Sequence, residues 1–225
     1  MTRESMLQEL ANRIVALDHN HPLRVAIDGI DAAGKTMLAN ELAPLIEAHG
    51  REVIRASVDD FQRPRAERYR QGADSAQSYY EDAFDYVSLQ DALLQPLGPM
   101  GNRRYRRAVF DFRTDIPLAT REEYADLGAV LLLDGVFLLR PELEHLWDYR
   151  IFVQVDFEVA LQRAMERDQR LFGDAEAVRR RYLQRYIPGQ RFYIQRDRPQ
   201  KRADAIVDNN DPASPQLHFQ SRIFD

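Results

Sequence analysis

Eight consecutive residues near the N-terminus have the types and spacing of a phosphate-binding loop. They are Gly29, Ile30, Asp31, Ala32, Ala33, Gly34, Lys35 and Thr36, with glycine at both required positions. Glycine lets the backbone curl so that its N–H groups point at phosphate oxygens, and Lys35 reaches the outer phosphates. The Thr36 hydroxyl is placed to ligate Mg²⁺. Because an apolar strand precedes the loop and an apolar-periodic helix follows it, this segment predicts binding of ATP and Mg²⁺ rather than a chance match.

Carboxylates at two predicted strand ends could complete a site for phosphoryl transfer. Asp134 follows an apolar run and precedes Gly135, which suits a second Mg²⁺ ligand at the edge of a sheet. Asp59 and Asp60 end another strand, and Asp59 is the candidate base that accepts the proton of an acceptor hydroxyl. The alternatives are that Asp134 merely ends a strand and that the adjacent acids form a turn or a helix cap.

Two arginines in the segment 158–186 are spaced like a clamp for phosphate charge. Arg163 and Arg167 stand at i and i+4, so they share one helix face and could act as catalytic groups in a lid. The alternative is a solvated basic face that pairs with neighbouring acids.

The elements that must position these groups follow from the hydrophobic pattern. Apolar runs at 23–27, 52–58, 129–133, 151–155 and 205–207 predict strands, and helical patterns separate most of them. The run 129–133 is apolar without alternation, as expected of a parallel strand buried on both faces. The pattern predicts an α/β fold in residues 1–225, a single domain with a doubly wound, mainly parallel five-stranded sheet. The long excursion 59–126 leaves a strand end, so we assign it to the acceptor.

Composition narrows the classes of protein. Of the 225 residues, 44% are hydrophobic and 30% are charged, which is ordinary for a globular chain. The net charge of −5 argues against broad nucleic-acid binding, the lack of cysteine excludes thiolate sites, and the five dispersed histidines give no support to a transition-metal site. Residues 1–18 lack an apolar core, so we expect no membrane partner and a cytoplasmic protein. The sequence leaves open whether the protein forms a homo-oligomer.

The order of these motifs resembles the uridine kinase family, a P-loop group that also includes phosphoribulokinases and bacterial pantothenate kinases. The resemblance covers most of the chain, and its matching segments are 29–36, 59–61, 82–85, 110–112, 134–135 and 203–207. It implies a P-loop NTPase fold of the nucleoside and nucleotide kinase type, with ATP and Mg²⁺ and a nucleoside such as uridine or cytidine as acceptor. It also implies that Asp59 rather than Asp60 is the base, and that Arg163 and Arg167 belong to the lid.

The acceptor pocket departs from that family at two positions. Uridine kinases hold the ribose with an aspartate where this chain has Ser78, Tyr79 and Tyr80, and they read the base with a histidine where it has Asp115. The predicted acceptor contacts are Asp60, Phe61, Tyr79, Phe84, Phe110, Phe112 and Asp115.

The aromatic residues among them could stack a planar base, or they could belong to the core. The departures leave open another small alcohol, such as nicotinamide riboside, pantothenate or a sugar phosphate. A nucleotide-dependent switch without transfer activity is the third reading, although the chain has no Asn-Lys-x-Asp element for guanine.

Overall fold

A central, mostly parallel sheet organises the protein, whose computed structural model describes residues 1–220. Within those residues the sheet has six strands in the order β10-β9-β8-β1-β7-β2, and only β10 runs antiparallel. The strands are β1 (Leu23–Gly29), β2 (Val53–Ser57), β7 (Val130–Gly135), β8 (Tyr149–Gln154), β9 (Ala205–Asp208) and β10 (Gln216–Phe219). The predicted α/β class with a mainly parallel sheet is therefore confirmed.

The sixth strand was missed by the sequence reasoning. β10 pairs only with β9, at the edge of the sheet, and its side chains are exposed except for a half-buried Leu217. An edge strand that covers little of the core needs no apolar run, so the hydrophobic pattern carried no signal for it.

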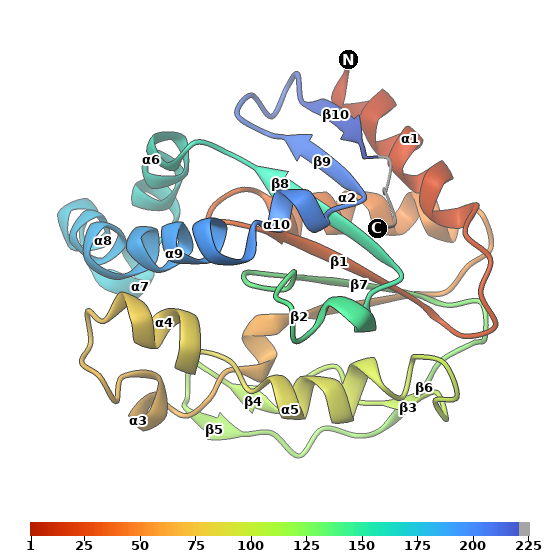
Figure 1. Cartoon of the computed structure of the whole chain (residues 1–225), viewed down its shortest axis with the longest axis horizontal. Coiled ribbons are helices and arrows are strands. Elements are labelled where there is room, and N and C mark those ends of the chain that lie inside the picture. Colours follow the sequence, from red (N-terminus) through yellow and green to blue (C-terminus); the bar gives the residue numbers. More distant parts are fainter. Residues whose placement is uncertain (221–225) are drawn as a thin grey trace.

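Helices cover both faces of the sheet (Figure 1). On one face α1 (Arg3–Val15) and α2 (Lys35–Glu47) pack together over alternate strand residues such as Val25 and Leu132. On the other face Leu131 and Leu133 pack against the aromatic residues of the excursion. This alternation is why the central strands read as continuous apolar runs.

The excursion 59–126 is folded rather than loose. Its helical elements are η1 (Val58–Phe61), α3 (Arg65–Arg68), α4 (Ala76–Asp82), α5 (Tyr86–Leu89) and η2 (Gln90–Leu94). Its strands pair as two small antiparallel sheets, β3 (Arg104–Tyr105) with β6 (Glu123–Tyr124) and β4 (Phe110–Asp111) with β5 (Ile116–Pro117). The excursion thus adds a structured wall beside the ends of β2 and β7.

A group of helices follows β8 and lies beside α3 and α4 in Figure 1. The short helix η3 (Glu144–Leu146) precedes β8. The group after β8 comprises α6 (Phe157–Arg167), α7 (Gln169–Phe172), α8 (Ala175–Arg181), η4 (Tyr182–Tyr186), α9 (Ile187–Asp197) and α10 (Pro199–Arg202). The helix path from α8 to α9 is continuous, and Pro188, which cannot donate an N–H, follows its π-helical turn η4. Among residues 1–220, no helix combines the length and apolarity that crossing a bilayer requires.

Candidate active site

The loop between β1 and α2 is curled around the amine of Lys35. Lys35 is buried, and its Nζ donates a hydrogen bond of 2.8 Å to the carbonyl of Ile30 at the opposite side of the loop. Two glycines allow this path. A Cβ on Gly29 would lie 2.4 Å from the carbonyl oxygen of Val153, and one on Gly34, where φ is 97°, would lie 2.6 Å from Nδ2 of Asn209.

Two side chains that the sequence analysis did not single out hold this loop from outside. Asn209, just after β9, donates from Nδ2 to the carbonyl of Ala33 at 2.7 Å. Gln190 in α9 donates to the Asp31 carboxylate at 2.6 Å. Both residues lie more than 150 positions from the loop, so no local pattern could have indicated them.

The two predicted metal ligands meet at the ends of neighbouring elements. Thr36 Oγ1 donates to Asp134 Oδ2 at 2.5 Å, across the junction of α2 and β7. Arg55 in β2, which the sequence analysis did not identify, contacts the other carboxylate oxygen at 2.8 Å. A hydroxyl and a carboxylate are the hard oxygen donors that Mg²⁺ prefers, so this pair fits that ion.

The carboxylates after β2 sit in an unusual electrostatic setting. Asp59 faces open space, yet protein atoms enclose it on its other sides, and this desolvation raises its pKa, with further contributions from the negative charges of Asp31 and Asp134. Gln62 donates to its Oδ1 at 3.0 Å. Burial, followed by the charge of Asp59, raises the pKa of Asp60 to about 6. Asp59 is therefore a stronger base than an ordinary aspartate.

A third carboxylate lies directly behind the phosphate loop and was not predicted. Asp28 is fully buried, accepts hydrogen bonds from the backbone N–H groups of Gly29 at 2.7 Å and Leu139 at 3.1 Å, and is contacted by the Tyr193 hydroxyl. Burial raises its pKa to about 6 despite these contacts. Its position makes it a titratable support of the loop.

A cavity of about 630 Å³ opens beside Asp59, between the excursion and the helices after β8. Six of the residues predicted to bind nucleotide or acceptor, or to act in catalysis, line it: Asp31, Asp59, Tyr79, Phe84, Phe112 and Arg167. Tyr79 donates to the Asp31 carboxylate at 2.8 Å, which ties the excursion to the loop between β1 and α2. The cavity and the loop are thus parts of one site.

Four of the predicted acceptor contacts lie elsewhere in the described chain. Phe61 is fully buried and packs in the core, and Phe110 is buried within β4, so the core reading holds for both rings. Asp60 and Asp115 are absent from the lining of the cavity. Asp115, at a φ of 61°, accepts hydrogen bonds from the backbone of Arg65 at 2.8 Å and from the Arg68 guanidinium at 3.2 Å, which anchors α3.

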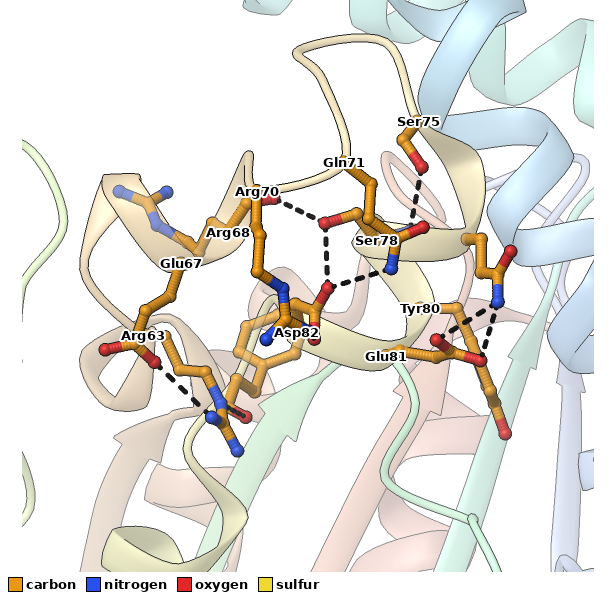
Figure 2. Close-up of polar contacts among 12 residues, drawn as sticks. Arg63, Glu67, Arg68, Arg70, Gln71, Ser75, Ser78, Tyr80, Glu81 and Asp82 are labelled. Atoms are coloured by element: carbon orange, nitrogen blue, oxygen red, sulfur yellow. Dashed lines mark hydrogen bonds and ion pairs between the residues drawn. The ribbon is translucent and has the colours of Figure 1, made fainter.

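Ser78, at the position of the uridine kinase aspartate, is fully buried and does not line the cavity, and Figure 2 shows its polar contacts. Its hydroxyl lies 2.9 Å from the carbonyl of Arg68 and 3.0 Å from the Asp82 carboxylate, to which Arg70 also donates at 3.0 Å. This network joins α3 to α4 and shapes the cavity wall from behind.

The two predicted lid arginines point to different places. Arg167 lines the cavity and pairs with Asp168 at 2.6 Å. Arg163 instead donates to the carbonyl oxygens of Asn209 and Asn210, at 2.9 Å and 3.1 Å, and does not line the cavity. The two arginines therefore do not form the expected joint clamp. Arg167 lies at the cavity, and Arg163 contacts the residues that follow β9.

One group of potential metal ligands lies outside this site. The ligand atoms of His19, His21 and Asp148 come within 4.8 Å of one another. The guanidinium of Arg24 contacts both oxygens of Asp148, each at 3.0 Å. One guanidinium thus engages both carboxylate oxygens that a cation would use, whereas Arg55 contacts a single oxygen of Asp134.

Comparison with known proteins places this geometry in a family. Residues 24–209 match the cytidylate kinase-like family. The chain belongs to that family. Two curated uridine kinases, from Chlamydia pneumoniae and Lactobacillus helveticus, are 30% and 28% identical over 189 and 193 residues. Each alignment covers 83% of this chain, and the alignments cover 81% and 86% of the two relatives. The resemblance to uridine kinases is confirmed, and this member of the cytidylate kinase-like family is a small-molecule kinase.

Solved structures show the same fold. A possible uridine kinase from Bacillus stearothermophilus superposes with a TM-score of 0.71 at 24% identity, over 90% of this chain and 97% of that one. A D-glycerate 3-kinase from Cryptococcus neoformans gives a TM-score of 0.63 at 14% identity, over 96% of this chain and 99% of that one. At these identities the two structures establish the architecture of this family member and nothing finer.

Proposed function

We propose that this kinase transfers the terminal phosphoryl group of ATP, in the presence of Mg²⁺, to a hydroxyl of a small molecule bound in the cavity. The observation that carries the proposal is the contact of 2.5 Å between Thr36 and Asp134, next to a base, Asp59, whose pKa the charge of Asp134 helps to raise. Metal ligands and base are therefore within electrostatic reach of one another.

Each group has a separate task in this scheme. Lys35 and the N–H groups of the loop bind the phosphates, and Thr36 and Asp134 hold Mg²⁺, which offsets phosphate charge when it is bound. Asp59 takes the proton of the acceptor hydroxyl on its carboxylate. Arg167, at the cavity, stabilises negative charge on the transferred group. Most of the catalysis comes from positioning and charge stabilisation.

Two classes of acceptor are candidates. Nucleosides such as uridine or cytidine come first, because the curated relatives are named uridine kinases. Small alcohols with a negative charge, such as pantothenate or sugar phosphates, come second, because arginines are frequent along the cavity wall and Ser78 and Asp115 are engaged in scaffold contacts.

The test is release of ADP from ATP and Mg²⁺ in the presence of single acceptors. Uridine, cytidine, nicotinamide riboside, pantothenate and sugar phosphates form the panel, and Lys35→Met serves as the control for contaminating ATPases. ADP release that rises only with an acceptor is expected. Equal release without any acceptor would instead support a nucleotide switch.

A further inference from the structure

Three arginines from two distant segments surround one aromatic ring at the cavity. The guanidinium carbons of Arg68, Arg181 and Arg185 lie 5.7, 5.1 and 4.7 Å from the centre of the Tyr69 ring. All four residues line the cavity. Arg68 comes from α3, and the other two come from the continuous path of α8 and η4. The fold thus concentrates positive charge on one wall.

The positive charge of this wall is poorly compensated. Arg185 is 2% exposed and has no ion pair among residues 1–220. Within residues 1–220, the only ion pair of Arg181 is with Asp74, at 3.4 Å, and the side chain of Asp74 is 62% exposed. Arg68 shares Asp115 with the backbone of Arg65. Burying a cation without a counter-charge is costly, and burial indeed lowers the pKa of Arg185.

The hydrogen bonds of the three guanidinium groups are also incomplete. Each guanidinium has five N–H donors. Arg181 and Arg185 donate mainly to the carbonyls of residues 68, 73 and 75, and Arg68 donates to Gln62 and Asp115. Among the described residues, the Nε atom of each of the three is buried without a partner. Because a buried Nε cannot contact a ligand, the donor capacity that remains for an anion lies in the terminal N–H groups. Arg68, for example, uses them in two hydrogen bonds although it has four such groups.

This wall is built in advance of any ligand. The carbonyl of Arg68 accepts hydrogen bonds from Arg185 at 3.0 Å and from the Ser78 hydroxyl at 2.9 Å. Ser78 is held in turn by Asp82, as Figure 2 shows. The nearby acids are already engaged: Asp31 accepts from Tyr79 and Gln190, and Asp168 accepts from Arg167 and Tyr182. Among residues 1–220, neither acid forms an ion pair with Arg68, Arg181 or Arg185.

We propose that Arg68, Arg181 and Arg185 form an anion subsite in the acceptor pocket, so that the acceptor is an alcohol carrying a carboxylate or phosphate group. The inference rests on the proposed kinase activity and, of the two classes of acceptor given above, selects the anionic alcohols over the neutral nucleosides. The hydroxyl lies at Asp59 and the anionic group at the arginines, and guanidinium groups bind both carboxylates and phosphates through paired N–H donors.

The first experiment compares related acceptors with and without an anionic group. We would measure kcat/KM for glycerol, D-glycerate and glycerol 3-phosphate, for panthenol and pantothenate, and for ribose and ribose 5-phosphate. In at least one set the anionic member is expected to have the higher kcat/KM. Comparison of the carboxylates with the phosphate esters then shows which anionic group the subsite prefers. A neutral member or a neutral nucleoside that outperforms every anion would overturn the proposal.

Variants of α8 provide the matched test. Arg181→Gln should raise KM for the anionic acceptor about tenfold or more while KM for ATP stays unchanged, because a charged hydrogen bond is lost. Arg181→Lys should recover part of the loss. Arg180→Gln removes the same charge one residue away, from an exposed position outside the cavity lining, and should have no effect. A raised KM for ATP instead would assign the arginines to the nucleotide.

A binding measurement separates this inference from the proposed activity. Inorganic phosphate and acetate would be titrated calorimetrically into the protein saturated with ADP and Mg²⁺, so that the phosphate loop is occupied. One of the two should bind, and Arg181→Gln should weaken it about tenfold while Arg180→Gln does not. Binding of neither anion would refute the subsite even in an active kinase. Arginine-dependent binding without any transfer would refute the kinase and keep the subsite.

Discussion

The hydroxyl of Thr36 lies 2.5 Å from a carboxylate oxygen of Asp134, although 98 positions separate the two residues. The contact arises because β1 and β7 pair in parallel with Ile27 opposite Asp134, while Thr36 stands in the first turn of the helix that follows β1. Arg55 holds the second oxygen from β2. Two elements, α2 and β7, thus bring oxygen ligands to one point, and β2 positions the carboxylate through Arg55.

Replacing this carboxylate should weaken the use of Mg²⁺. In Asp134→Asn, we expect the Mg²⁺ concentration for half-maximal activity to rise about tenfold or more, because an amide carries no charge for the ion. Titration of activity with Mg²⁺ at saturating ATP measures this. Asp126→Asn, an exposed aspartate before the same strand, is the control. An unchanged Mg²⁺ requirement in Asp134→Asn would remove Asp134 from the metal site.

The base can be tested by a pair of neighbouring substitutions. Asp59→Asn should lower kcat about a thousandfold with KM for ATP nearly unchanged, because general-base catalysis is lost. Asp60→Asn should keep kcat within about tenfold, since Asp60 does not line the cavity. In the wild type kcat should fall as the pH is lowered, because enclosure raises the pKa of Asp59 and only its charged form accepts a proton. Retained turnover in Asp59→Asn would exclude it as the base.

The two lid arginines should differ in effect. Arg167→Gln should reduce kcat about a hundredfold through loss of charge stabilisation, whereas Arg163→Gln should leave kcat within about threefold. Arg163 donates to the carbonyls of Asn209 and Asn210, so its loss should lower the free energy of unfolding by about 1 kcal/mol. Steady-state kinetics and urea unfolding of both variants check this. Equal losses of kcat would show that the helix closes as one clamp.

Burial of Asp28 should make stability depend on pH. Its pKa is raised from 3.8 to about 6, so between these values the folded state binds more protons than the unfolded state. The free energy of unfolding should therefore fall as the pH rises through this window, by about 3 kcal/mol from this group. Urea unfolding of the wild type and of Asp28→Asn gives their free energies of unfolding at pH 4 and pH 7. The difference between the two proteins should change between these pH values. A constant difference would show that the Asp28 pKa is not raised.

What the sequence determined by itself is local. The loop 29–36, Asp59 and Asp134 were recognisable because a phosphate cradle and the acids at strand ends follow from residue types at short spacing. Apolar runs indicated the parallel strands of the central sheet. They gave no signal for β10, which buries too little to leave a pattern, or for the four two-residue strands of the excursion.

The tertiary structure decided which side chains meet. Helical spacing put Arg163 and Arg167 on one face, but packing turned one to β9 and the other to the cavity. Arg68 and Arg185 lie 117 positions apart and share one wall only because α3 and η4 pack at the same cavity. Local spacing sets backbone geometry, whereas contacts between distant segments depend on how whole elements pack. That is why the phosphate loop could be read directly and the anion subsite could not.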